Sequence, residues 1–97
     1  MVDEDATRYP IDGALDLHEF RPEDTGSLVP EYLRACRAEG ILRVRIVHGK
    51  GSGALRQSVH AILERRPEVT RFHLAGGQSG WGATIAHLRP AGGEQRE

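Results

Sequence analysis

The chain has 97 residues, with 13 Lys and Arg against 14 Asp and Glu, which gives a formal net charge of −1 when its five histidines are neutral. Hydrophobic residues make up 38% of the chain and charged residues 28%, and this composition predicts one folded domain rather than a disordered chain. The small net charge excludes a protein-wide positive field, so binding of a polyanion would require a local basic patch.

The sequence supports neither export nor membrane insertion. Its first residues include the acidic segment 3–5, and no apolar run approaches the roughly 18 residues that a membrane span needs. Cys36 is the only cysteine, so no intramolecular disulfide can form. We therefore expect a monomeric, cytoplasmic protein that does not contact a membrane.

The two ends of the chain are polar and aperiodic, and we predict tails at residues 1–10 and 91–97. Between them, residues 11–90 contain no internal repeat and no low-complexity tract. The folded body should therefore be a single domain of that extent.

A first strand is predicted at residues 11–18, because two leucines there alternate with polar side chains. On such a strand Asp16 and His18 share one face, opposite the leucines. A carboxylate beside an imidazole suits a general base that is oriented by an acid, and it also suits a metal ligand. A structural histidine and a turn-forming aspartate remain the alternatives for the same two residues.

A first helix is predicted at residues 25–39, where apolar residues are spaced three and four apart. Thr25 or Ser27 is expected to cap its start, with Pro30 in the first turn, where the missing N–H costs little. Gly40 stands where a C-terminal glycine commonly ends a helix.

The second half of the chain predicts a strand, a helix and two further strands. Alternating residues indicate strands at 42–47 and 69–75, and a β-branched run indicates a last strand at 83–88. An apolar stripe predicts a helix at 54–66, which Pro67 stops. The resulting order, βαβαββ, predicts an α+β two-layer sandwich within the broad α/β class, with two helices on one face of a four-stranded sheet and the other face open.

The open face of this predicted sheet should be polar and basic. The period of two places four side chains on it, namely Arg43, Arg45, Arg71 and His73. A solvated sheet face is the ordinary interpretation of such residues, and contact with DNA or RNA is the alternative.

Residues 48–53, which we call the glycine loop, run from a predicted strand end through three glycines into a helix start. Free backbone N–H groups at a helix N-terminus can bind an anion, and glycines let a phosphate backbone come close. Lys50 and Arg56 add positive charge there. Since βαβ strands are parallel, His18 and His48 should meet at one sheet edge. A Walker A loop is excluded because the lysine directly follows the first glycine.

Three segments together resemble the Smr (small MutS-related) domain family. They are Leu15-Asp16-Leu17-His18 with Arg21, the segment 44–56 with His48-Gly49-Lys50-Gly51, and Gly80-Trp81-Gly82-Ala83-Thr84-Ile85. The resemblance spans about residues 12–89. It implies a mixed four-stranded sheet with two helices, and binding or nicking of DNA or RNA, although family membership alone does not establish cleavage.

The resemblance, together with the residue chemistry, predicts a site. Asp16, His18 and His48 are the candidate catalytic residues: His18, oriented by Asp16, would activate water or a ribose hydroxyl, and His48 would protonate or hold the leaving oxygen. The candidate nucleic-acid contacts are Arg21, Gly49, Lys50, Gly51, Gly53, Arg56, Trp81 and Gly82. Trp81 suits either stacking on an unpaired base or packing against the sheet edge.

One departure from the family pattern concerns a metal. Glu19 stands where the common Leu-Asp-Leu-His-Gly form has glycine, and it would allow Asp16, His18 and Glu19 to hold a divalent cation such as Mg or Mn. The sequence leaves two functions open: an endonuclease acting on DNA or RNA, and a non-catalytic module that binds nucleic acid or a ribonucleoprotein.

Overall fold

Four strands form one mixed sheet in the order β1-β2-β4-β3 in the computed structural model, which describes residues 10–77 and 82–91. β1 (Ala14–Asp16) runs parallel to β2 (Arg43–Val47). β4 (Ala83–Leu88) lies between β2 and β3 (Val69–Leu74) and is antiparallel to both. The βαβαββ order and the mixed sheet are confirmed. Most of both predicted tails lies outside the described residues.

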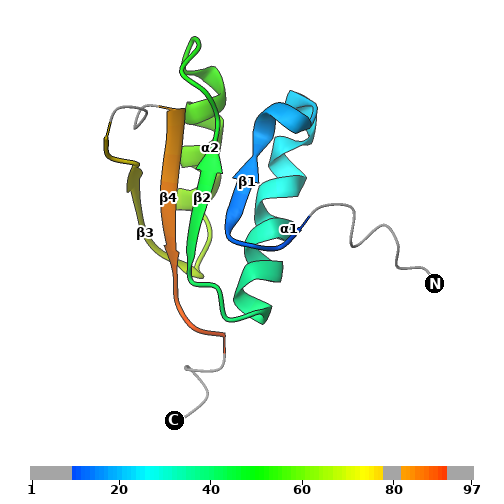
Figure 1. Ribbon diagram of the computed structural model, residues 1–97, viewed down its shortest axis with the longest axis vertical. Coiled ribbons are helices and arrows are strands. Elements are labelled where there is room, and N and C mark those ends of the chain that lie inside the picture. Colours follow the sequence, from blue (N-terminus) through cyan, green and yellow to red (C-terminus); the bar gives the residue numbers. More distant parts are fainter. Residues whose placement is uncertain (1–9, 78–81, 92–97) are drawn as a thin grey trace, which may run out of the picture.

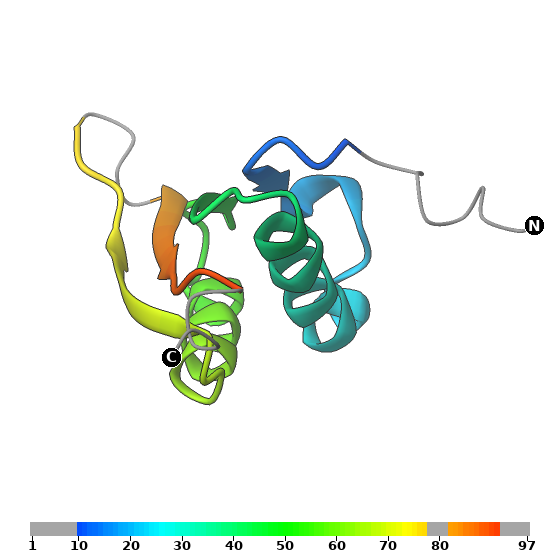
Figure 2. The same ribbon diagram turned by 90° about the horizontal axis from the view of Figure 1, so that it is seen from below.

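Two helices pack on the same face of this sheet. α1 (Thr25–Ala38) lies behind β1 and α2 (Ala54–Glu64) lies behind β2 and β4 in Figure 1, and Figure 2 shows both helices on one side of the sheet. The two-layer architecture with two helices on one face is confirmed. We call the opposite side the helix-free face; the viewer of Figure 1 looks onto it. None of the described helices is long and apolar enough to cross a membrane.

The main core fills the space between the helices and the sheet. Val44 and Ile46 of β2 are fully buried against it, as the alternating pattern predicts, and so are Leu33 of α1 and Val59 of α2. Burying one side chain of this size stabilises the fold by about 1.5–3 kcal/mol. The core therefore fixes which face of each strand is turned away from solvent.

The start of α1 differs from the prediction. A 3-10 turn, η3 (Pro22–Asp24), leads into the helix, and the N-cap Asp24 makes no side-chain capping hydrogen bond. Neither predicted cap acts as one, since Ser27 Oγ donates to the Asp24 carbonyl at 3.3 Å and buried Thr25 is the first helical residue. Pro30 lies inside the helix, one turn later than predicted, because the helix begins before its apolar stripe.

The end of α1 follows the prediction. Gly40 has a φ of +80°, a backbone conformation that glycine adopts without steric cost. Its N–H donates to the Arg37 carbonyl at 3.0 Å, and the Ile41 N–H donates to the Cys36 carbonyl at 2.9 Å. This pair of bonds is a Schellman motif, which satisfies carbonyls that the helix itself leaves free.

β1 is shorter than predicted. It ends at Asp16, and the chain then turns through a 3-10 helix, η2 (Leu17–Glu19), so His18 does not lie on a strand. The carboxylate of Asp16 accepts the backbone N–H of His18 at 2.9 Å, and such a local bond competes with the sheet ladder. The predicted alternation fails at this point, although Leu17 is still buried.

The helix-free face is only partly as polar as predicted. Arg43, Arg71 and His73 are exposed on it, but Val47 and Ile85 pack there with two alanines in a small apolar cluster, and Ile85 is only 2% exposed. Leu74, expected to point into the core, is 43% exposed. It ends the edge strand β3, which has one neighbouring strand only.

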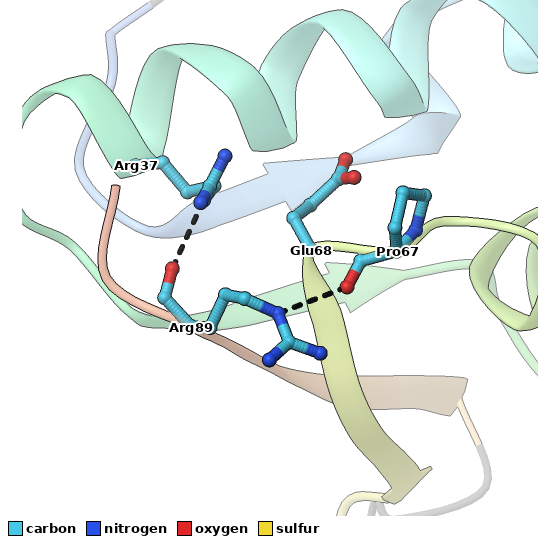
Figure 3. A pocket seen from close by; sticks show the side chains of 4 residues that line it. All are labelled: Arg37, Pro67, Glu68 and Arg89. Carbon is cyan, nitrogen blue, oxygen red and sulfur yellow. Dashed lines mark hydrogen bonds between the residues drawn. The ribbon is translucent and has the colours of Figure 1, made fainter. Parts of the chain in front are cut away.

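Two arginines tie the far end of the sheet together, at the opposite end from the glycine loop. Arg37 of α1 donates to the Arg89 carbonyl at 2.9 Å, and Arg89 donates to the Pro67 carbonyl at 3.0 Å around a hollow that Glu68 also lines (Figure 3). Glu68 is buried and pairs with Arg66 at 3.0 Å. These bonds hold the chain just after β4 against α1 and the start of β3.

Tyr32 joins α1 to the beginning of β1. Its side chain is fully buried, and its hydroxyl accepts the Gly13 N–H at 3.1 Å while lying 3.3 Å from Asp12 Oδ1 and 3.1 Å from the Ala14 carbonyl. Burial raises the pKa of Tyr32 to about 12. The hydroxyl is therefore neutral at neutral pH and able to donate and accept at once.

Replacing Tyr32 by phenylalanine should lower the free energy of unfolding by about 1–3 kcal/mol, because the Gly13 N–H then loses its partner in a half-buried position. Urea unfolding followed by circular dichroism measures this. Ser58→Ala, which removes an exposed hydroxyl from α2, should change stability by no more than about 0.5 kcal/mol. Equal stabilities of Tyr32→Phe and the native chain would show that these bonds contribute nothing net.

Candidate functional site

Asp16 and His18 form a hydrogen-bonded pair at the end of β1. Asp16 Oδ1 lies 2.8 Å from His18 Nδ1, and the two side chains are 46% and 60% exposed. A carboxylate at this distance favours a proton on Nδ1, which leaves Nε2 with its lone pair in the neutral ring. The predicted pairing is confirmed, but the turn of η2 produces it rather than strand alternation. His18 thus has an exposed side chain whose Nε2 keeps its lone pair.

The imidazole of His18 lies directly against Gly49 of the glycine loop. A Cβ atom built on Gly49 would stand 2.7 Å from His18 Nε2, and Gly49 has a φ of +85°. Both the space and the backbone conformation therefore require glycine here. The ends of the parallel strands β1 and β2 meet as predicted, and this contact places Nε2 beside the loop backbone.

Gly82, just before β4, lies in the third segment of the chain that contacts the site. Its carbonyl accepts the N–H of His48 at 2.8 Å and that of Gly49 at 2.9 Å. A Cβ on Gly82 would lie 3.5 Å from Lys50 Cγ. The described parts of the three sequence segments thus come together in one place. Gly80 and Trp81 lie outside the described residues, so the expected role of Trp81 stays a prediction.

His48 is buried, with 4% of its surface exposed, and both of its ring nitrogens have protein partners. Nδ1 lies 3.1 Å from the Gly49 carbonyl, and Nε2 lies 2.8 Å from Thr84 Oγ1. His60 Nε2 lies 2.7 Å from the same hydroxyl. A carbonyl only accepts, so Nδ1 of His48 carries its proton, Thr84 donates to His48, and His60 donates to Thr84. These three side chains form a continuous buried relay.

Burial keeps both histidines of this relay neutral. Desolvation is the main cause that lowers the pKa of His48, and the nearby charges of Arg56 and His18 act in the same direction. Desolvation also lowers the pKa of His60, with further contributions from His48 and Arg56. Neutral rings are what the relay requires, since a second proton on His48 would face the Thr84 hydroxyl proton. His48 therefore holds the loop and has no ring nitrogen free of protein partners.

The sequence analysis missed Thr84 and His60 as parts of this site. Thr84 is opposite Ile46 in the sheet register and is fully buried on the helix-covered face. A hydroxyl at a core-facing strand position was the available signal, because a buried hydroxyl requires partners. His60 lies on α2, half-buried between this hydroxyl and Phe72, and only the packing of α2 brings it there.

The start of α2 offers positive charge and backbone donors, of which the Ala54 N–H donates to Ser52 Oγ at 3.3 Å. Gly53, with a φ of +92°, is the N-cap and provides no side-chain capping bond. A Cβ there would lie 2.9 Å from Arg56 Nη2, so the guanidinium folds back over the helix start. Lys50 and Gly51 are exposed beside it. A helix N-terminus flanked in this way has the composition of an anion site, as the sequence predicts.

Arg21 has local partners of its own. Its Nε lies 3.6 Å from a carboxylate oxygen of Glu23 and 3.5 Å from one of Asp24, and its side chain is 73% exposed. Such surface ion pairs contribute little stability, so a phosphate group can displace the two carboxylates from Arg21. Arg21 remains a predicted nucleic-acid contact, held near the start of α1.

The predicted metal trio is not a preformed site. Asp16 and His18 contact each other, but residues 10–77 and 82–91 contain no group of three or more His, Cys, Asp or Glu placed to hold a metal ion. Glu19 is exposed next to His18 at the end of η2. The expected Mg or Mn cofactor is therefore still a prediction, and it would need ligands from substrate or water.

The family model that matches this chain is the Smr domain, over residues 15–89. The chain belongs to the Smr domain family. Among curated relatives, "Endonuclease MutS2" of Halothermothrix orenii is 39% identical over 80 residues, and the protein of the same name from Brevibacillus brevis is 40% identical over 76 residues. These matches cover 81% and 77% of this chain but 10% of each relative. The chain thus spans about a tenth of the length of those proteins.

Solved structures show the same fold. The Smr domain of Thermus thermophilus MutS2 is 36% identical with a TM-score of 0.75, and the match covers 81% of this chain and all of that one. YdaL of Escherichia coli, described as a stand-alone small MutS-related protein, is 26% identical with a TM-score of 0.74, over 88% of this chain and 70% of YdaL. These likenesses support the sheet order of this Smr domain, and with it the meeting of the strand ends at the site.

Thr84→Val should destabilise this Smr domain by about 2–3 kcal/mol, since the nearly isosteric valine leaves His48 Nε2 and the His60 N–H without their partner in the interior. Urea unfolding at neutral pH measures it. The matched control is Thr70→Val, which removes an exposed hydroxyl that donates to the His87 carbonyl, and its cost should stay below about 1 kcal/mol. Equal costs for the two substitutions would contradict the relay.

The lowered pKa values of His48 and His60 predict a loss of stability in acid. In the unfolded chain, histidine takes up its proton near pH 6.5, whereas the folded relay does so only at lower pH. The free energy of unfolding is therefore unaffected above pH 6.5 and decreases as the pH is lowered further. From about pH 7.5 to about pH 5.5, the native domain should lose more stability than His48→Gln/His60→Gln. Ser58→Ala, which removes an exposed hydroxyl from α2 and no titratable group, should retain the native pH dependence. Parallel curves for the native and double-variant domains would overturn this assignment.

Proposed function

We propose that this Smr domain is an endonuclease that binds DNA or RNA at the glycine loop and cleaves a phosphodiester bond with His18 as the general base. The observation behind the proposal is the Asp16–His18 pair, with Nδ1 bonded to the carboxylate at 2.8 Å and the opposite nitrogen beside Gly49. A base oriented by an acid, next to a backbone able to bind phosphate, has the parts that such a reaction needs.

Substrate binding would use the positive end of α2. The free N–H groups at the helix start, together with Lys50 and Arg56, would bind the phosphate that is to be cleaved. Gly51 is exposed and a Cβ there would have nothing within 4 Å, so the substrate backbone can approach the loop at this residue. Gly82, with its carbonyl bonded to the loop, would keep this approach open.

The chemical step would begin at His18 Nε2. This nitrogen takes the proton of a water molecule or of a ribose hydroxyl, whose oxygen then attacks phosphorus while the bond from phosphorus to the leaving oxygen breaks. The Asp16 carboxylate stabilises the imidazolium that forms, and the leaving oxygen receives a proton from it or from solvent. Lys50 and Arg56 would offset the charge that builds up on the phosphate oxygens. His48 would act as a positioning residue, because its nitrogens hold Gly49 and Thr84.

The relatives support this proposal by their names only. Two are called "Endonuclease MutS2", and the region that this chain matches is a tenth of each. The match covers the segments that form the site described above. YdaL, described as a stand-alone small MutS-related protein, supports the idea that an Smr domain can function outside a protein of MutS2 length.

A non-catalytic binding module is the second candidate. The observation that favours it is the exposure of the Asp16–His18 pair, at 46% and 60%, in a region of the described structure that holds no preformed metal group. A solvated pair can contact a phosphate or a ribose hydroxyl by hydrogen bonds without cleaving anything. In that case the glycine loop would dock the domain on nucleic acid or a ribonucleoprotein.

The test is incubation of the purified chain with supercoiled plasmid and with single-stranded RNA, each with Mg²⁺, with Mn²⁺ and with EDTA. Nicked plasmid or shortened RNA is the expected product, and His18→Ala should lower its rate by about 10²–10⁴-fold. Asp16→Asn should also reduce the rate, whereas Glu31→Gln, which neutralises an exposed carboxylate on α1, should leave it unchanged. Activity that persists in EDTA would contradict the prediction of a Mg or Mn cofactor.

Two outcomes would overturn the assignment. Equal cleavage by His18→Ala and the native chain would show that His18 is not the base. No cleavage of either substrate, with salt-sensitive binding retained, would replace the endonuclease by the binding module. Circular dichroism of each variant verifies that the fold is intact.

A further inference from the structure

We propose that the helix-free face is a second nucleic-acid contact surface, on which Arg43, His87 and Arg71 bind the phosphate backbone of the strand held at the glycine loop. This inference rests on the proposed binding of nucleic acid at the loop and extends it to a surface about 13 Å away along β2. Three features support this second surface: the sheet register, a pair of histidines, and charge complementarity with a polyanion.

The sheet register aligns three basic side chains across three strands. His87 of β4 lies opposite Arg43 of β2 on one side and opposite Arg71 of β3 on the other. With neighbouring strands about 4.8 Å apart, these residues form a row about 10 Å long. Both arginines are exposed and His87 is half-buried between them. We call these three residues the cationic row.

Two more basic residues adjoin this row. Arg45 and His73 lie on the same face, each opposite Ile85 of β4 in the next register position. Ile85 and Val47 make the centre of the face apolar, and Ile85 is almost fully buried there, so the basic groups adjoin a covered apolar centre. Like charges brought together in this way oppose folding, and a bound polyanion would relieve their repulsion.

His73 and His87 contact each other within this group. Their Nε2 atoms are 2.9 Å apart and their rings stack with centroids 5.0 Å apart. His73 Nδ1 lies 3.0 Å from the Leu74 carbonyl and must donate to it, so its Nε2 accepts the N–H of His87. Both rings are neutral in this arrangement. A further proton on His73 Nε2 would break the bond between the rings, whereas a further proton on His87 Nδ1 would leave it intact.

The charges that face His87 make that further proton unfavourable in the free protein. They are Arg43 of β2 and, from β3, Arg71 and His73, and together with desolvation, the largest cause, they lower the pKa of His87. A phosphate bound to the cationic row supplies the missing counter-charge. Binding would therefore take up a proton, and the affinity should rise as the pH falls below 6.5, the ordinary imidazole value.

The row and the glycine loop share the strand β2. Arg43 begins β2, whereas the glycine loop follows Val47 at its other end, and both Arg43 and Val47 are on the helix-free face. On this face, Asp16 lies opposite Val47, next to the glycine loop. Its carboxylate pairs with His18. A nucleic-acid strand leaving the loop along β2 would therefore reach the row after passing the apolar centre.

The test measures binding of a fluorescein-labelled single-stranded DNA oligonucleotide to the full chain by anisotropy over a range of salt concentrations. Arg43→Gln/Arg71→Gln should weaken binding at least about tenfold at 0.1 M salt and reduce the slope of log K against log salt by about 1.4, since each lost phosphate contact removes about 0.7. The matched control, Arg34→Gln/Arg65→Gln, removes two exposed arginines from the helix side and should bind like the native chain.

The outcomes separate this inference from the function proposed above. Lys50→Gln/Arg56→Gln should also weaken binding, because it alters the loop. Loss of affinity in that variant with native affinity in Arg43→Gln/Arg71→Gln would overturn the second surface alone. Absence of binding by the native chain both to this oligonucleotide and to an RNA of the same sequence would overturn both proposals. Circular dichroism of the row variant, which changes two exposed side chains, verifies that its fold is retained.

A second readout tests the histidines. Between about pH 8 and about pH 5.5, the native affinity should rise, and His73→Gln/His87→Gln should show a smaller rise. An unchanged rise in affinity in this variant would show that the histidine pair does not contribute to nucleic-acid binding. A charge-neutral structural role for the pair would alter stability and leave the pH profile of binding as it is in the native chain.

Discussion

The parallel register between β1 and β2 is the constraint on which the site depends. Asp16 lies opposite Val47, so the chain leaves both strands at the same level, and His18 meets Gly49 just beyond the sheet. A slip by one residue would turn Asp16 to the helix-covered face and Leu15 to the other. The burial of Leu15 against the core therefore fixes the position of the polar pair.

The site combines two kinds of polar group with different surroundings. The side chains of Asp16 and His18 are exposed, at 46% and 60%, whereas His48 and Thr84 are buried and have fixed hydrogen-bond partners. A buried polar group that is fully bonded gives rigidity, because breaking one bond leaves the partner unsatisfied in a medium of low dielectric. The buried relay thus holds the glycine loop in place, and the exposed pair is left free to contact a ligand.

Local patterns predicted most of the fold. The apolar stripes of α1 and α2, the alternation in β2 and the β-branched run of β4 each reflect one buried face, and a buried face determines the type of element. The errors are at places where another interaction prevails. The N-cap bond of Asp16 ended β1 early, the turn at Pro22–Asp24 started α1 ahead of Pro30, and an apolar cluster formed around Ile85 on a face expected to be polar.

The sequence by itself determined the element order, the family resemblance and the pairing of Asp16 with His18, because each of these depends on neighbours a few residues apart or on a motif. Only the tertiary structure decided that His48 is buried, that Thr84 links it to His60 over 36 and 24 positions, and that His73 meets His87 across 14. The physical reason is that these contacts arise from strand register and helix packing. Both are set by burial summed over the whole core rather than by any local pattern.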